Sequence, residues 1–166
     1  MKIGILSDTH SKIKEAKKTL DFLVQNGAEF IIHAGDVCKY ETLELLATCG
    51  VRYVAVYGNN DAHLVQYHNE YNLVQEPNYF KIANTKFKLM HLPFYMAPDA
   101  DVVVFGHTHI FESEFKNNTL FLNPGEVCAR EKPTTECVML EVKDEEFIVE
   151  YFANYEKTKT FSYKRD

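Results

Sequence analysis

The sequence lacks several features that would place it among membrane or multidomain proteins. None of its apolar runs approaches the ~20 residues that a helix needs to cross a bilayer, so no membrane association is expected. Residues 1–6 already have the pattern of a strand and leave no room for a signal peptide. The 166 residues contain no internal repeat, low-complexity tract or linker. They therefore predict one cytoplasmic domain, residues 1–166.

Positive charge and paired cysteines are also scarce. Lysine and arginine number 18 against 24 acidic residues, and the net charge of −6 argues against bulk binding of nucleic acid. The four cysteines form no CxxC pair and are too few for a disulfide scaffold. We expect them to be reduced and packed in the interior. They are Cys38, Cys49, Cys128 and Cys137.

Strands and helices alternate through the first sixty residues. Short apolar runs predict strands at residues 3–6, 30–33 and 53–57. Apolar residues on a helical period predict helices at residues 12–26 and 40–48, each followed by a glycine. This order is typical of an α/β fold with a largely parallel sheet, in which ligands bind beyond the carboxyl ends of the strands.

The second half of the chain has a different pattern. It predicts hairpins at residues 79–91, 110–122 and 136–152. It also predicts one buried strand at residues 102–105. We interpret them as a second, mostly antiparallel sheet packed on the first. The final dozen residues are expected to fray.

Polar motifs follow the predicted strands, where a ligand site is expected. Their carboxylate, amide and imidazole groups form a mixed oxygen and nitrogen set that suits divalent manganese, iron, nickel or zinc. If the backbone is extended, residues i and i+2 point to the same side, so each D-x-H or H-x-H motif could present two ligands. Each motif alone is a weak signal, but together they are poorly explained as turns. The motifs are Asp8-Thr9-His10, Gly35-Asp36, Gly58-Asn59-Asn60-Asp61, His91 and Gly106-His107-Thr108-His109.

This ordered set resembles the calcineurin-like metallophosphoesterase superfamily, especially its small bacterial and archaeal phosphodiesterase branch (YfcE-like). The match runs from residue 1 to about residue 125, where Asn123-Pro124-Gly125 is similar to the NPG segment of that branch. The resemblance implies an α/β fold in which a two-sheet sandwich is flanked by helices. It also implies two divalent metal ions, manganese first, with iron, nickel or zinc as alternatives.

The resemblance further assigns a role to each motif residue. Asp36 would bridge the two ions, and Asp61 would orient a neighbour through a hydrogen bond. The expected catalytic residues are Asp36, Asn59, His91 and Asp61. One ion would be held by Asp8, His10 and His109, and the other by Asn59, His91 and His107.

The implied function is hydrolysis of a small phosphate ester by in-line attack of a metal-bridging hydroxide. A diester is the first expectation, and nucleotide-like esters are one option. Two cations about 3.5–4 Å apart lower the pKa of a shared water and offset charge on the transferring group. Two other functions remain open: an interaction scaffold, like the retromer subunit of similar fold that has lost its ligands and activity, and a nucleotide-binding regulator. All seven expected ligand positions are filled here, which favours an enzyme.

Two departures from the family pattern bear on chemistry. Asn60 stands where many members have histidine, and because an asparagine is no general acid, we expect a preference for activated diesters. His63 and His68 are expected to face solvent rather than to replace that acid. Glu126 stands where the branch often has serine, and we expect its side chain to face solvent as well.

The segment after His91 also departs from the pattern. Pro93 and Pro98 exclude a regular helix from residues 92–100, where the family commonly has one. The side chains of residues 94–96 would then cover exposed sheet or form a homodimer contact.

Three further residues are weighed as secondary candidates. Arg130 is a candidate phosphate contact, whereas His33 is expected to be structural and Tyr57 to belong to the core.

Overall fold

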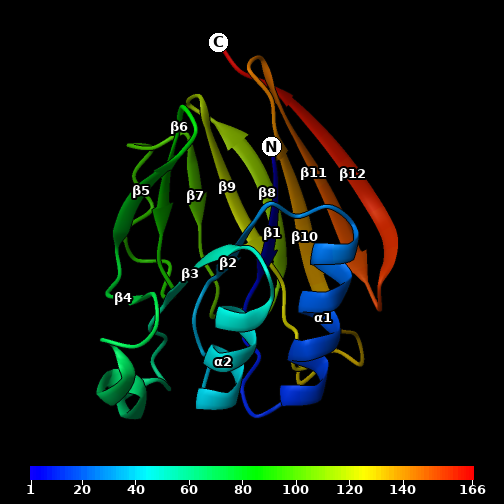
Figure 1. The fold of residues 1–166 in the computed structure, drawn as a ribbon. Helices are drawn as coiled ribbons and strands as arrows, with labels where there is room; N and C mark the ends of the chain where they lie inside the picture. The colour runs from blue at the N-terminus through cyan, green and yellow to red at the C-terminus, as the bar shows by residue number, and fades with distance from the viewer.

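A seven-stranded sheet and a five-stranded sheet pack face to face in the computed structural model, which describes residues 1–166 (Figure 1). The larger sheet contains, from edge to edge, β12 (Glu156–Lys164), β11 (Glu146–Ala153), β10 (Glu136–Val142), β1 (Lys2–Leu6), β2 (Phe30–His33), β3 (Arg52–Val56) and β4 (Leu73–Val74). The smaller sheet contains β5 (Asn78–Ile82), β6 (Thr85–Leu89), β7 (Val102–Val104), β9 (Thr119–Pro124) and β8 (Phe111–Lys116). The expected two-sheet α/β sandwich is therefore confirmed.

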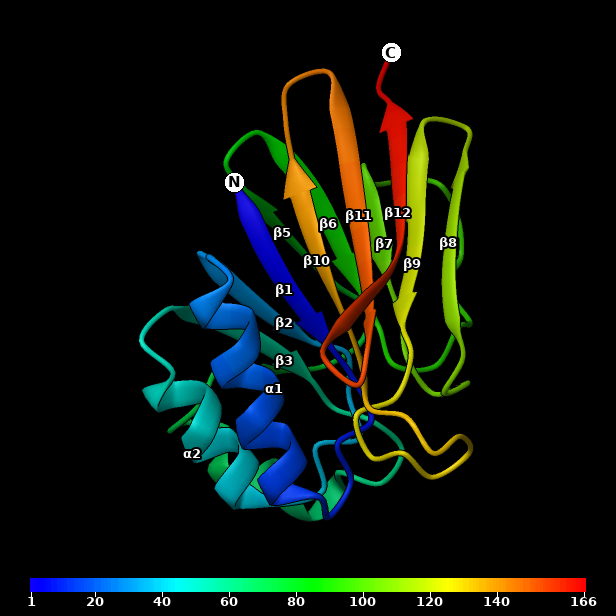
Figure 2. The ribbon, with the colours of Figure 1, turned by 90° about the vertical axis from the view of Figure 1, so that its right-hand side faces the viewer.

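Two helices cover the outer face of the larger sheet. They are α1 (Ile13–Gln25) and α2 (Tyr40–Thr48), and they lie side by side against β1, β2 and β3 (Figures 1 and 2). Leu23 of α1 and Leu46 of α2 are fully buried in the same apolar cluster as Ile31 of β2. Strands β1, β2 and β3 are parallel, as predicted, and β4 runs parallel to β3, so their carboxyl ends all point toward one end of the sandwich.

The C-terminal strands extend the larger sheet, which corrects two expectations. The hairpin of β10 and β11 was expected in the second sheet, but β10 pairs antiparallel with β1, with Ile3 opposite Leu140. The expected fraying of the last dozen residues was also wrong. They form β12, which pairs along β11 and packs Phe161 and Tyr163 against the core.

The interior between the sheets is a single apolar cluster. Alternate residues of the larger sheet, such as Ile5 and Ile32, meet Leu89, Val104 and Leu122 of the smaller one, all without exposure to solvent. The smaller sheet is mixed rather than mostly antiparallel, because β6, β7 and β9 run parallel. Its parallel strands add further carboxyl ends to the same end of the sandwich.

The outer face of the smaller sheet has no helix over it. Residues 92–100 connect β6 to β7 without regular structure, as the two prolines predict. Met96 packs against the cluster of Val103 and Phe105 on this face, whereas Phe94 is 74% exposed. None of the helices is long and apolar enough to span a membrane.

Candidate functional site

The predicted site residues lie together beyond the carboxyl ends of five strands. Asp8 and His10 follow β1, Asp36 follows β2 and Asn59 follows β3, while His91 follows β6. His107 and His109 follow β7. All seven of these side chains belong to one connected set of contacts, so segments a hundred residues apart in the chain converge.

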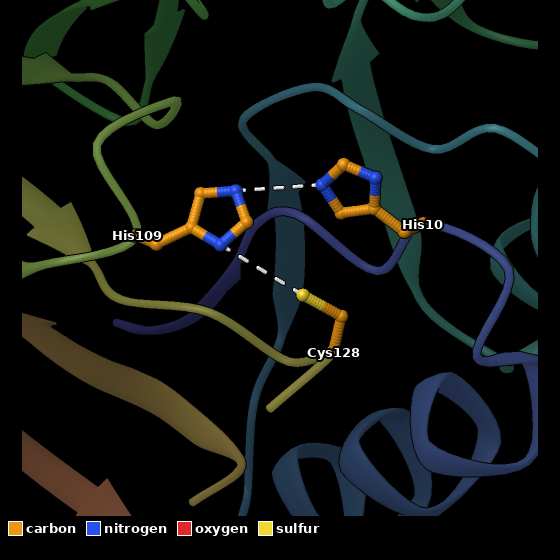
Figure 3. Close-up of side chains that lie close together, drawn as sticks. All are labelled: His10, His109 and Cys128. Atoms are coloured by element: carbon orange, nitrogen blue, oxygen red, sulfur yellow. Dashed lines mark hydrogen bonds between the residues drawn. The ribbon is translucent and has the colours of Figure 1, made fainter. Parts of the chain in front are cut away.

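The first group of side chains surrounds an oxygen of Asp8. Its Oδ1 atom lies 3.2 Å from Nε2 of His109 and 3.8 Å from Nε2 of His10. The two imidazoles face each other with their Nε2 atoms 3.4 Å apart (Figure 3). Asp36 reaches the same group, because its Oδ2 lies 3.6 Å from Nε2 of His10.

The second group shares Asp36 with the first. The same Oδ2 atom of Asp36 lies 3.4 Å from Nε2 of His91. Oδ1 of Asn59 lies 2.9 Å from that nitrogen and 3.1 Å from Nδ1 of His107. Asp36 is thus the residue common to both groups, in the position that the family resemblance implies for a bridge.

Both groups fit divalent cations. Atoms that bind one ion at about 2.0–2.2 Å lie about 3–3.6 Å from one another, close to the distances found here. Oδ1 of Asp8 is completely buried and has no hydrogen-bond partner, which leaves a carboxylate oxygen in need of positive charge. Burial opposes ionisation of Asp8, but the adjacent imidazoles of His10 and His109 outweigh that effect and lower the pKa of its carboxyl. An oxygen and nitrogen donor set of this kind suits manganese, iron, nickel or zinc.

The acidic side chains also shift the pKa values of the histidines, and the histidines shift those of the acids. Hydrogen bonding to Asp8, with contributions from Cys128 and Glu126, raises the pKa of His109 to about 11. Burial raises the pKa of Asp36, but hydrogen bonding from His91 outweighs it and leaves the value at about 2. The centre of the site therefore favours a positive charge.

The backbone at these residues is left-handed rather than extended. The angle φ is +54° at Asp8, +46° at His10 and +54° at Asp36, and it is +67° and +61° at His107 and His109. The motif pairs do converge, but our reason for it, an extended strand end, was wrong. Non-glycine residues rarely adopt this conformation, and its concentration in one place is typical of functional sites.

Glycines let the loops approach the acidic side chains closely. A Cβ atom on Gly58 would lie 2.2 Å from Oδ1 of Asp36, and one on Gly106 would lie 2.2 Å from Oγ of Ser7. No side chain fits in either place. The glycines of the GN and GH motifs are therefore required by packing around the carboxylates.

Asp61 and Asn60 hold the loop that carries Asp36. The carboxylate of Asp61 accepts hydrogen bonds from the backbone amides of Val37, Cys38 and Gly58, at 2.7–3.0 Å. Asn60 donates from its backbone amide and its side chain to the two oxygens of Asp36, at 3.0 and 2.9 Å. The sequence marks Asn60 only as the absence of an acid, because its contact with Asp36 depends on the fold.

Glu126 corrects another expectation, because it is completely buried instead of facing solvent. Its carboxylate accepts a hydrogen bond from Nδ1 of His109 at 2.6 Å and from the backbone amides of Arg130, Glu131 and Lys132. Burial raises the pKa of Glu126, but these donors outweigh it and lower the value to about 2. Because Glu126 holds the proton on Nδ1, Nε2 is the nitrogen of His109 that a cation beside Asp8 could bind in place of the Nε2 proton.

His91 is oriented in the same manner. Its Nδ1 donates to the backbone oxygen of Ala34 at 2.8 Å, which leaves Nε2, beside Asp36, as the nitrogen that a cation could bind in place of a proton. The carboxylate of Glu76 accepts hydrogen bonds from the amides of His91 and Leu92 and fixes this loop. Glu76 carries no motif, so sequence reasoning missed it.

Other candidates fall outside the centre of the site. His33 is buried, bonded to Thr9 and Gly35, and burial lowers its pKa to about 4, which confirms a structural role. His63 and His68 are exposed at η1 (Ala62–Tyr67) and at its end, as expected. Tyr57 is half-buried and packs against the core, also as expected.

All four cysteines are free, as predicted, but two of them lie beside the site. Sγ of Cys128 is 3.8 Å from Nδ1 of His109 (Figure 3), and Sγ of Cys38 is 3.7 Å from Nδ1 of His10. Burial raises the pKa of the Cys38 thiol to about 12, so it is a neutral neighbour of the site.

The two groups open onto a surface pocket of about 360 Å³. This volume suits a small molecule. The pocket is lined almost entirely by polar side chains, and Arg130 is the one lysine or arginine among them. The lining residues are His10, Asp36, Asn59, Asn60, His107, Thr108, His109, Ile110, Arg130 and Glu131.

Known proteins share both the sequence pattern and the fold. Phosphodiesterase MJ0936 of Methanocaldococcus jannaschii is 31% identical over 141 residues, which cover 77% of this chain and 85% of that protein. Phosphodiesterase YfcE of Escherichia coli K12 is 23% identical over 146 residues, covering 76% and 79%. Among solved structures, an archaeal phosphodiesterase superposes with a TM-score of 0.79 at 26% identity and covers 92% of this chain and 99% of its own.

A second solved structure shares the fold at lower identity. Vacuolar protein sorting 29 from Cryptosporidium parvum superposes with a TM-score of 0.80 at 17% identity, covering 99% of this chain and 98% of its own. A likeness at this level concerns the fold alone. The family model described as the calcineurin-like phosphoesterase superfamily domain, by contrast, matches residues 1–145 of the sequence itself. The resemblance to this superfamily and to its YfcE-like branch is thereby confirmed, and the chain belongs to the calcineurin-like phosphoesterase superfamily.

Proposed function

We propose that this chain is a phosphodiesterase that depends on two divalent metal ions, manganese in the first place. Asp8, His10 and His109 would hold one ion, Asn59, His91 and His107 the other, and Asp36 both. Its substrate would be a small phosphate ester, with nucleotide-like esters as one option, bound in the pocket beside Arg130. The 166 residues would act as one domain.

One observation carries this proposal. Oδ2 of Asp36 lies within 3.6 Å of an imidazole nitrogen of each group, next to a buried oxygen of Asp8 that has no partner. A purely structural cluster would satisfy that oxygen with a donor, because an unpaired buried polar atom is costly. Two adjacent cation sites that share a carboxylate explain both features.

The residues of the chain would divide the work of ester hydrolysis. Bound divalent ions supply a nucleophile at neutral pH and offset the charge that develops on the phosphoryl group. Asp36 would set the separation of the two groups, and Asn60 and Asp61 would keep Asp36 in place through the hydrogen bonds described above. His91 and His109 would keep their Nε2 atoms free because Ala34 and Glu126 hold their Nδ1 protons.

The three histidines that line the pocket are proposed metal ligands, so none of them would be free to donate a proton to a poor leaving group. Asn60 is an amide, and His63 and His68 bond to backbone oxygens of Cys38 and Val65 outside the pocket. An enzyme without such an acid depends on the leaving group being stable as an anion. We therefore propose that activated diesters are better substrates than alkyl monoesters.

The proposal is tested by counting bound manganese by mass spectrometry and by following hydrolysis of bis(p-nitrophenyl) phosphate. We expect about two ions per chain and manganese-dependent turnover in the unaltered protein. Asp36→Asn should lower both the ion count and the turnover. Loss of a residue that only supports a ligand costs up to about a hundredfold in activity, and we expect a larger loss of turnover here. Asp21→Asn is the matched control, because Asp21 is an exposed carboxylate on α1 paired with Lys17.

Other outcomes would favour the alternatives. Tight manganese binding without turnover of any diester would point to a nucleotide-binding regulator on this fold. Absence of both metal binding and turnover would point to an interaction scaffold. The association state, for which residues 94–96 offer a homodimer contact, and the expected cytoplasmic location are separate proposals that light scattering and fractionation of cells would test.

A further inference from the structure

Arg130 makes an unexpected contact with one of the candidate ligands. Its Nη2 atom donates a hydrogen bond to Nδ1 of His10 at 2.9 Å. The same guanidinium supplies the only lysine or arginine charge that lines the pocket. The residue therefore touches both the proposed metal centre and the space in which a substrate would lie.

In this contact the lone pair on Nδ1 of His10 accepts the hydrogen bond from Arg130. A neutral imidazole has one N–H and one lone pair, on different nitrogens. When Arg130 donates to Nδ1, the proton must be on Nε2, the atom that faces Asp36 and His109. A cation held by Nε2 requires the opposite arrangement, with the proton on Nδ1, where Arg130 can no longer donate. The two contacts are mutually exclusive.

The other buried histidines of the site show no such conflict. Nδ1 of His91 faces the backbone oxygen of Ala34, and Nδ1 of His109 faces the carboxylate of Glu126. Both neighbours accept a proton from Nδ1 and so favour a free lone pair on Nε2. His10 alone has a cationic donor in this place. Sγ of Cys38, 3.7 Å from Nδ1, is the weak acceptor that the proton could use instead.

The local structure lets the Arg130 side chain change partners while its backbone stays fixed. Its amide donates to the buried carboxylate of Glu126 at 3.1 Å, and the amides of the next two residues do the same. The side chain, by contrast, is exposed at the rim of the pocket. A guanidinium is a planar fork of donors that matches the oxygens of a phosphate group.

We infer that Arg130 binds the phosphate group of the substrate, and that a cation on His10 makes its guanidinium available by competing for the lone pair of that histidine. Without a cation, Arg130 supplies positive charge next to the acidic centre. With a cation in place, the same charge is free for the anionic ester. This inference rests on the proposed function and adds an order of events, in which the metal binds before the substrate.

The test measures two affinities by calorimetry: manganese for the metal-free protein, and inorganic phosphate for the manganese-loaded protein. Arg130→Gln should bind manganese about two- to tenfold more tightly, because a competing hydrogen bond is gone. It should bind phosphate about ten- to a hundredfold more weakly, because a charge-assisted contact is lost. Arg130→Lys should recover part of the phosphate affinity, since it keeps the charge but not the fork.

Arg52→Gln is the matched control, because Arg52 is exposed at the start of β3, at the end of the strand away from the site. It should leave both affinities unchanged. Opposite shifts in Arg130→Gln separate this role from a merely structural one, because replacement of a structural residue would weaken both affinities. If both fall, or if phosphate binds as in the control, the inference is overturned while manganese-dependent turnover leaves the proposed function standing. If the unaltered protein binds no divalent ion, the proposed function and this inference fail together.

Discussion

The imidazole of His109 donates from Nδ1 to the buried carboxylate of Glu126 at 2.6 Å. The same carboxylate accepts hydrogen bonds from three consecutive backbone amides. One side chain thus orients a candidate ligand and folds the loop that carries Arg130. Replacement of Glu126 by alanine would leave several buried donors without a partner. We expect the free energy of unfolding to fall by about 2–4 kcal/mol in urea titrations.

The isosteric change Glu126→Gln separates the two roles. A glutamine retains the shape but offers one acceptor oxygen, so we expect manganese affinity to drop by about ten- to a hundredfold, as is usual for a supporting partner of a ligand. Glu156→Gln, which changes an exposed carboxylate on β12 far from the site, should behave as the unaltered protein. Equal manganese affinity in the two variants would show that Glu126 serves the loop only.

Glu126 also predicts a pH dependence of stability. Its pKa is lowered from an ordinary 4.5 to about 2 on folding, so its ionised form stabilises the native state above pH 4.5. That contribution is lost as the pH falls from 4.5 through 2. We expect the metal-free protein to lose stability over this interval more steeply than Glu126→Gln does. Urea unfolding at a series of pH values measures the difference, and parallel curves would contradict the assignment.

Gly58 offers a steric test of the shared carboxylate. A methyl group there would lie 2.2 Å from Oδ1 of Asp36 and 2.3 Å from its amide nitrogen, so Asp36 must move. We expect Gly58→Ala to cost about 1–3 kcal/mol of stability and to reduce diesterase turnover more than tenfold. Gly50→Ala is the comparison, because its Cβ would meet nothing within 4 Å although its φ is +92°. It should cost stability alone, and reduced turnover in that variant would weaken the steric argument.

The absence of an acid at Asn60 predicts a dependence on the leaving group. Acid catalysis usually contributes about 10²–10⁴-fold when the leaving group is poor. We expect bis(p-nitrophenyl) phosphate to be hydrolysed readily and alkyl monoesters slowly, with rates that fall as the pKa of the leaving alcohol rises. Steady-state kinetics on a graded series of esters measures this slope. A flat slope, or equal rates on both classes, would mean that an acid exists in the loaded site.

The C-terminal strand predicts the effect of a truncation. A chain that ends at residue 154 loses β12, including the packing of Phe161 and Tyr163 on the core, and exposes the edge of β11. We expect the free energy of unfolding to fall by about 2–5 kcal/mol and light scattering to report association through the new edge. Removal of Asp166 alone is the control. An unchanged urea midpoint would contradict the role given to β12.

Local sequence signals accounted for most of the fold. Helix α2 begins and ends where the apolar period and Gly50 predict, and β2 also has its expected limits. The signals failed where structure depends on a distant partner. In β12 most side chains are charged or polar because one face of an edge strand meets solvent, so only its pairing with β11 defines it. The sheet that receives β10 is likewise decided by packing, not by local pattern.

The candidate site was predictable in its residue types but not in its supporting contacts. Asp36, His91 and the other motif residues follow apolar strands, and parallel strands bring their ends together. The roles of Glu126 and Glu76 depend on backbone amides that a loop presents, and no spacing in the sequence reveals those. The conflict between Arg130 and a cation at His10 likewise arises between residues 120 positions apart.

The left-handed backbone at five candidate ligands lowers the stability of the fold while it positions their side chains for function. These residues are Asp8, His10, Asp36, His107 and His109. Each such conformation costs of order 1–3 kcal/mol for a non-glycine residue, a sum comparable with the whole stability of a small domain. Glycine would relieve that cost at every one of these positions but would remove the side chain that makes the position useful. Directed evolution for heat resistance alone would therefore tend to discard these residues first, so a screen for robust variants of this protein has to select for metal retention at the same time.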